Sequence, residues 1–100
     1  MKPKEISQLI EKEINGDWTI SNRHGCNLKK CLIRPKKGKL RSGGEIKDYW
    51  IVLEEIPETL EGWKVFFDEK TNKFGLAGHS DPVGYVATLD DTFIAAFKSM

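Results

Sequence analysis

The sequence has no long apolar run, few cysteines and almost no net charge. No stretch approaches the roughly 18 apolar residues that a membrane-spanning helix needs, and no apolar segment near the start indicates a secretory signal. The 16 Lys and Arg nearly balance the 15 Asp and Glu, which excludes a histone-like basic chain and a disordered acidic tail. We therefore expect a cytoplasmic protein that has no membrane partner.

Only two cysteines, Cys26 and Cys31, are present. A secreted domain of this size would more often carry several disulfides, so the count favours a reducing compartment and free thiols, with a single bridge as the alternative. Together with His24 and His79, the cysteines lack the paired spacing of a structural zinc site. We predict no metal and no cofactor.

One hundred residues, 39% of them hydrophobic, are enough for a single domain over residues 1–100 with one modest core. Apolar residues at helical spacing predict an amphipathic helix over residues 3–15, which ends at Asn15-Gly16. A second helix is predicted after an N-cap at Thr88, with apolar residues recurring as far as Met100.

Segments of high strand propensity between the helices predict about five strands. The segments are 18–20, 28–34, 48–53, 63–68 and 74–77, with 82–86 as a weaker edge strand. The links between them are too short for parallel crossovers, so we expect an antiparallel sheet. The N-terminal and C-terminal helices should pack on one face of it, which gives an α+β fold. The charged, glycine-containing segment 35–44 is expected to be a flexible loop.

A basic segment with no acidic residue spans positions 29–41. Its cations are Lys29, Lys30, Arg34, Lys36, Lys37, Lys39 and Arg41. Lys and Arg can neutralise phosphates, but no stacking aromatic lies within the segment and no nucleic-acid motif accompanies it. The plain interpretation is a solvated loop. Contact with phosphate or nucleic acid is one alternative, and docking on an acidic protein is another.

Four carboxylates follow the strongest predicted strand. They are Glu54, Glu55, Glu58 and Glu61. Paired carboxylates can serve acid–base chemistry or hold a hard cation, but no motif for either use accompanies them. They therefore indicate a solvated loop or an acidic surface that binds a basic protein partner.

Two short segments combine side chains found in catalytic sites. His24 lies close to Cys26, and His79 is followed by Ser80 and Asp81. Catalytic groups are assembled from distant parts of a fold, and both segments are typical of turns. We therefore assign no catalytic residue and favour a non-enzymatic protein.

Several short strings resemble a family of small uncharacterised bacterial proteins of about this length. The most specific are W-I-V-L-E-E-x-P at residues 50–57 and F-G-L-A at 74–77, supported by Gly16-Asp17-Trp18, His24-Gly25, Gly62-Trp63 and Gly84-Tyr85. The resemblance covers most of the chain and implies no activity or catalytic residue. Small α+β proteins also include immunity proteins that neutralise bacterial toxins, which is an analogy of fold only.

The lead hypothesis is a non-enzymatic protein-binding module, with toxin neutralisation as one version, and the alternative is nucleic-acid or phosphate binding through residues 29–41. The near-zero net charge conceals an asymmetry. Residues 1–41 carry 11 Lys and Arg and 4 Asp and Glu, a net charge of +7, whereas residues 42–100 carry 5 and 11, a net charge of −6. The fold decides whether these charges separate or interleave.

Overall fold

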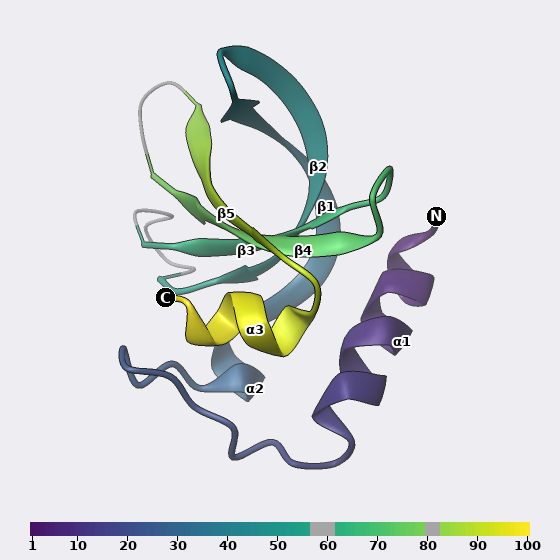
Figure 1. Cartoon of the computed structure of the whole chain (residues 1–100). Helices are drawn as coiled ribbons and strands as arrows, with labels where there is room; N and C mark the ends of the chain where they lie inside the picture. Colours follow the sequence, from purple (N-terminus) through teal and green to yellow (C-terminus); the bar gives the residue numbers. More distant parts are fainter. Residues whose placement is uncertain (57–61, 80–82) are drawn as a thin grey trace.

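Five strands and three helices make up the part of the chain that the computed structural model describes, residues 1–56, 62–79 and 83–100 (Figure 1). The elements are α1 (Pro3–Ile14), α2 (Leu28–Cys31), β1 (Leu32–Ser42), β2 (Glu45–Glu54), β3 (Lys64–Asp68), β4 (Lys73–Gly78), β5 (Gly84–Asp90) and α3 (Phe93–Lys98). The Cα radius of gyration of 12.3 Å is close to the value of about 13 Å for a single domain of this length. None of the helices in these ranges is long and apolar enough to span a membrane.

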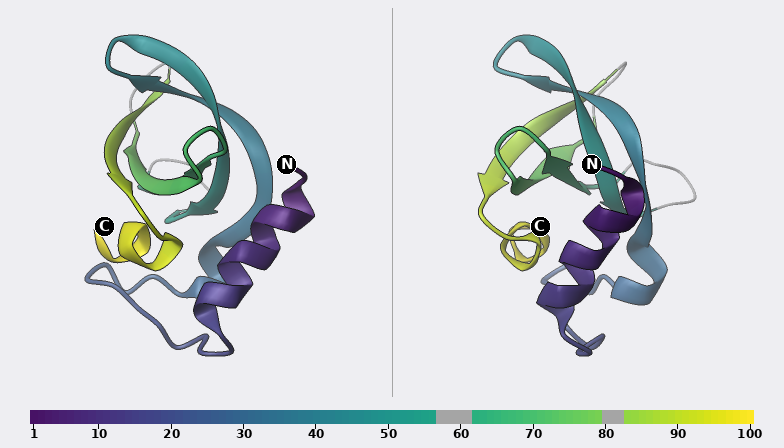
Figure 2. Two further views of the ribbon diagram at one scale, coloured as in Figure 1. Left: turned by 45° about the vertical axis from the view of Figure 1, so that its right-hand side comes forward. Right: turned by 90° about the vertical axis from the view of Figure 1, so that its right-hand side faces the viewer.

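The strands follow one another around a small closed barrel (Figure 2). Consecutive strands pair antiparallel, but β5 then pairs parallel with β1 at Leu40–Gly84 and Arg41–Tyr85. The expected α+β class and five strands are confirmed, and the simple antiparallel sheet is wrong. The cause is β1, an 11-residue strand with an irregularity between Leu32 and Lys36, which curves far enough to reach β5.

The predicted elements match the structure better in the second half of the chain than in the first. The predicted strands 48–53, 63–68 and 74–77 correspond to β2, β3 and β4, whereas residues 18–20 form no strand. The expected loop 35–44 is mostly strand β1, because its backbone pairs with β2. Lys37, Lys39 and Arg41 lie outside the barrel, whereas Lys36 lies on the same side of the strand as Leu40. The last helix begins after Thr92, not Thr88, because residues 84–90 form β5.

Helix α1 agrees with the predicted helix 3–15. Its first turn is stabilised by the Glu5 carboxylate, which accepts a hydrogen bond of 2.9 Å from the Lys2 backbone N–H. It ends where Asn15 adopts a left-handed conformation with φ of 50°. Ile6, Ile10 and Ile14 are buried, so the predicted apolar face is the one that packs on the rest of the molecule.

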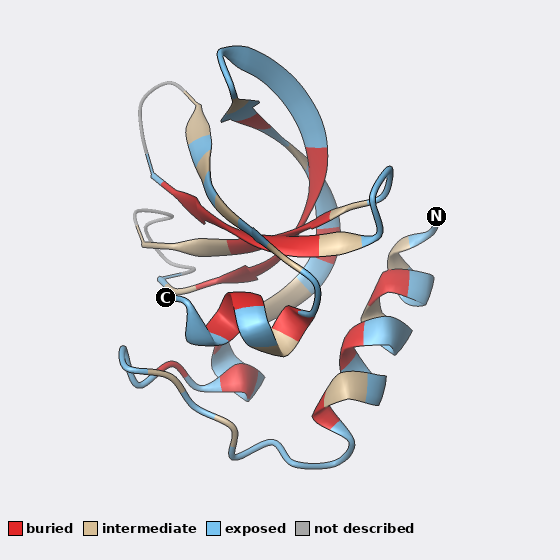
Figure 3. Ribbon diagram, in the orientation of Figure 1, coloured by how far each residue is buried: buried red, intermediate tan, exposed pale blue. Residues whose placement is uncertain are grey.

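The apolar side chains form two clusters, one on each side of the barrel wall. The outer cluster joins Ile10 of α1 and Phe93 of α3 to Phe67 and Phe74. Buried positions recur along α1, α3 and the strands of the barrel (Figure 3). The inner cluster fills the barrel with Leu40, Tyr49, Ile51, Phe66 and Ala77. Burial of these apolar side chains stabilises the fold by about 1.5–3 kcal/mol for each fully buried Leu, Ile, Val or Phe.

One carboxylate joins the two terminal helices. Glu13 of α1 accepts hydrogen bonds from the backbone N–H groups of Phe93 and Ile94, at 2.9 and 3.0 Å. These are first-turn N–H groups of α3, which have no partner inside the helix. Thr92 accepts a third, from Ala95 N–H at 3.1 Å. The first turn of α3 is therefore held by α1 as well as by its own N-cap.

Candidate functional site

The basic segment 29–41 lies on α2 and β1, and all seven of its cations are exposed. Asn27 starts α2, because its side-chain oxygen accepts a hydrogen bond of 2.9 Å from Lys29 N–H. In β1, alternate residues face opposite sides of the barrel wall. Leu40 is therefore buried inside while Lys39 and Arg41 lie outside.

The seven cations divide into two groups according to their contacts. The three in the middle of β1 have partners: Lys36 Nζ lies 3.6 Å from Glu54 Oε1, Lys39 Nζ lies 3.1 Å from Asp48 Oδ1, and Lys37 lies over the Trp50 ring. In the described ranges the other four form no ion pair; they are Lys29, Lys30, Arg34 and Arg41. The opposite charges of the two halves of the chain therefore interleave along β1 and β2.

A hollow of about 400 Å³ lies where α1, α2 and the start of β1 meet, and we call it the outer groove. Its lining is formed by Ser7, Ile10, Glu11, Trp18, Leu28, Lys29, Leu32, Ile33 and Arg34, so that two cations and one carboxylate border it. Ile10 and Leu28 are buried, whereas Lys29 and Arg34 are exposed and Trp18 is 36% exposed. The fold thus brings an aromatic side chain to a basic segment that has none in the sequence.

The predicted acidic surface is only partly described by the structure. Glu54 is 4% exposed, so its carboxylate is buried at the end of β2. Glu55 is half-buried and accepts a hydrogen bond of 3.0 Å from Trp63 N–H. Glu58 and Glu61 lie outside the described residues. Of the four predicted residues, Glu54 and Glu55 thus have roles within the fold.

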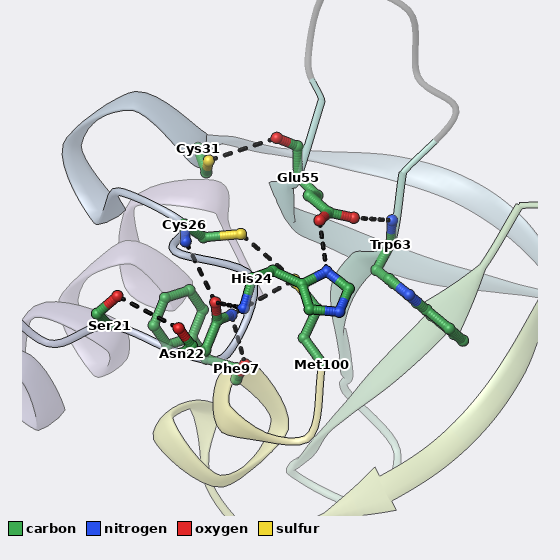
Figure 4. Close-up of polar contacts among 9 residues, drawn as sticks. All are labelled: Ser21, Asn22, His24, Cys26, Cys31, Glu55, Trp63, Phe97 and Met100. Carbon is green, nitrogen blue, oxygen red and sulfur yellow. Dashed lines mark hydrogen bonds and ion pairs between the residues drawn. The ribbon is translucent and has the colours of Figure 1, made fainter.

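The His and Cys residues near position 26 form a polar network around the C-terminus (Figure 4). His24 Nδ1 lies 2.6 Å from Glu55 Oε2, and the Cys31 thiol lies 3.6 Å from the Glu55 carbonyl oxygen. Asn22 donates a hydrogen bond to the Phe97 carbonyl at 2.9 Å and accepts one from Cys26 N–H at 3.2 Å. Through these contacts, the segment that follows α1 is bound both to α3 and to the residue that follows β2.

The chemistry of this network is that of a structural site. Cys26 and Cys31 are both free and buried. Burial raises the pKa of the Cys26 thiol above its ordinary value, and a hydrogen bond with Asn22 only partly opposes this. Because the thiolate is the reactive form, a raised pKa makes Cys26 a poor nucleophile. Across the described ranges, no three His, Cys, Asp or Glu side chains gather as metal ligands.

A second hollow, of about 460 Å³, opens at one end of the barrel, and we call it the barrel mouth. Its lining includes Lys36, Leu40, Ile51, Glu54, Lys64 and His79. Sequence reasoning gave no role to Lys64, although its alternation with the buried Phe66 places both on the inner face of β3. The Ser80 and Asp81 that follow His79 lie outside the described residues.

No family model, curated protein or solved structure matches this chain. The resemblance to small bacterial proteins therefore stays a prediction. The function has to be argued from the two hollows themselves.

Proposed function

We propose that the protein is a non-enzymatic binding module whose outer groove takes an acidic segment of a partner protein. The observation that carries the proposal is the combination of buried apolar residues with exposed Lys29 and Arg34, neither of which has an ion pair in the described part of the chain. Protein interfaces combine an apolar centre with a polar rim, and Trp and Arg are frequent at their strongest contacts.

The apolar lining favours a protein over a nucleic acid. Trp18 and Ile33, which keep accessible apolar surface, would bury aliphatic or aromatic side chains of a partner, whereas a phosphate backbone laid over them would lose water without gaining hydrogen bonds. A track for nucleic acid would also use the middle of the basic segment, where Lys39 is paired with Asp48. Nucleic-acid binding through residues 29–41 is therefore the alternative outcome of the test.

The predicted acidic surface and toxin neutralisation are more specific forms of the protein-binding hypothesis. Because Glu54 is buried, an acidic surface for a basic partner would depend on Glu58 and Glu61, outside the described residues. The outer groove instead fits an acidic partner, which would associate quickly through charge complementarity. A toxin with an acidic segment around an apolar anchor would fit this description.

The proposal is tested with fluorescein-labelled peptides in which Leu or Phe is flanked by Asp and Glu. Single-stranded DNA and RNA of similar net charge serve as the second set of probes. We expect peptide binding by fluorescence polarisation, weakened about tenfold by Trp18→Ala and at least as much by combined Lys29→Glu and Arg34→Glu. Lys98→Glu, a charge reversal on the exposed side of α3, is the matched control and should have little effect.

Two results would contradict the proposal. Binding of the oligonucleotides but not the peptides, with the same sensitivity to Lys29 and Arg34, would establish the nucleic-acid alternative. Binding of neither probe would remove the outer groove as a functional site for an anionic partner.

A further inference from the structure

The barrel mouth lies beside the parallel pairing of β1 with β5. Within the described ranges this pairing consists of Leu40–Gly84 and Arg41–Tyr85. The preceding residues of β1, from Lys36 onward, line the hollow together with Val83 and Gly84 beside β5. The mouths of β-barrels are common places for small ligands, and a volume of about 460 Å³ lies within the usual range of about 300–1,000 Å³.

The barrel mouth contains a carboxylate oxygen that lacks a partner. Glu54 is 4% exposed, and its Oε2 is buried without a hydrogen bond to any group in the described ranges. Its Oε1 lies 3.6 Å from Lys36 Nζ, which is an ion pair too long for a good hydrogen bond. Buried polar atoms in native proteins almost always have a hydrogen-bond partner, so Oε2 calls for a donor that the described residues do not supply.

Cations surround this carboxylate. Lys36 is exposed at the opening, and Lys64 is half-buried on the inner face of β3, where it pairs with Glu54 across the sheet. Burial lowers the pKa of Lys64, the Glu54 carboxylate opposes this change, and the Lys36 ammonium adds to it. Among the described residues that line the hollow, lysines outnumber the single carboxylate of Glu54, so this part of the lining attracts an anionic group.

The other residues that line the hollow favour a ligand that also has an apolar part. Leu40, Ile51 and Val83 provide an apolar wall, and His79 lies beside it at the end of β4. A hydrocarbon part of a ligand would lie against this wall while its anionic end meets the lysines. The inner cluster behind the wall, with Phe66 fully buried, gives the hollow a rigid base.

We propose that the barrel mouth binds a small organic anion that carries a hydroxyl or N–H donor close to its carboxylate or phosphate group. The anionic group lies near Lys36 and Lys64, and the donor makes a hydrogen bond to Oε2 of Glu54. This site is independent of the outer groove and of the protein partner proposed for it, because the two hollows share no lining residue.

Malate and succinate are suitable probes, because they differ by one hydroxyl group on the same dicarboxylate. In NMR titrations of the full chain, malate is expected to shift the amide signals of residues 36–40, 51 and 54. Malate should bind about fivefold more tightly than succinate, the usual contribution of one hydrogen bond. Glu54→Gln should reduce that preference to less than about twofold, because the amide is a weaker acceptor than a carboxylate.

Charge at the opening is tested separately. Lys36→Met should weaken both dicarboxylates by about threefold or more, whereas Lys47→Met, which removes a cation bound to Glu45 near the β1–β2 turn, should change neither. Circular dichroism establishes that each variant is folded. If Glu54→Gln does not fold, the comparison of malate with succinate on the wild-type protein still decides.

Two results would overturn the proposal. One is that neither dicarboxylate shifts the barrel-mouth signals at about 10 mM, well above the dissociation constant of a millimolar ligand. The other is that malate and succinate bind equally to the wild-type protein, which would show that Oε2 of Glu54 accepts no hydrogen bond from the ligand.

Discussion

The outer groove and the barrel mouth take their cations from the same basic segment but use them differently. In the outer groove, Lys29 and Arg34 are exposed above buried apolar residues. In the barrel mouth, Lys36 lies beside a carboxylate that is almost fully buried. The irregularity of β1 between Leu32 and Lys36 lies where the two sets of cations divide, so one run of charge in the sequence contributes to two surfaces.

This difference shows that the role of a charged side chain depends on its exposure and its ion-pair partners more than on the number of charges in the segment. Exposed cations without a partner contribute little to stability, and their charge is available for binding. A buried carboxylate is costly to the fold, and our proposal accounts for Glu54 by giving it a role in binding at the hollow. Substitutions should therefore affect binding at the outer groove, and both packing and binding at the barrel mouth.

The largest effect is expected from Gly75→Ala in β4. A Cβ at this position would lie 2.4 Å from the Phe66 ring and 2.4 Å from the Thr88 carbonyl oxygen, inside the barrel. We expect a loss of about 3 kcal/mol in the free energy of unfolding, measured by urea denaturation. Ala87→Ser, at an exposed position of β5, is the control. An unchanged free energy of unfolding would mean that Phe66 and the backbone of β5 can move to accommodate the added methyl group.

A smaller effect is expected from Glu54→Gln. Because Oε2 has no hydrogen bond in the described ranges and Lys36 is exposed, a neutral amide should change the free energy of unfolding by less than about 1 kcal/mol. Urea denaturation measures this change. A structural buried ion pair would instead lose about 3–5 kcal/mol, and that result would assign Glu54 to stability rather than to a ligand.

The smallest effect is expected where β1 and β2 extend beyond the barrel. The Lys39–Asp48 pair is exposed, with side chains 68% and 59% accessible. Lys39→Ala should lower the free energy of unfolding by less than about 0.5 kcal/mol, and added salt should remove most of that difference. A larger loss in thermal denaturation would show that this pair holds β1 in register.

The elements that could be predicted from the sequence are those whose residues show a regular pattern. The strand of Tyr49 to Leu53 follows from strand propensity and the helix with Ile6 and Ile10 from apolar periodicity, and both are confirmed. The closure of the barrel could not be predicted, because it depends on the bend of β1 and on two residue pairs with β5. Strand β1 could not be predicted because most of its residues are charged. The alternation of apolar and polar residues that is typical of a strand is visible at little more than Gly38 and Leu40.

The two candidate sites were only partly visible in the sequence. The sequence shows Lys29 and Arg34 as members of a basic segment. Trp18 reaches the same hollow only through tertiary packing, and its position could not be predicted because no helix or strand connects it to that segment. Glu54 was found as an acid of an exposed loop and is buried instead, because β2 extends to include it. In the structure Glu54 is the register partner of Lys64, and both residues face the inside of the barrel.

The most direct test of the separation between the two sites is one NMR experiment on the isotopically labelled wild-type protein. The acidic peptide and malate are added one after the other, and amide shifts are assigned to residues. The account predicts that the peptide shifts signals of residues 10, 18 and 28–34, that malate shifts those of 36–40, 51 and 54, and that each set persists when the other ligand is present. Competition of the two ligands for one set of residues would contradict it.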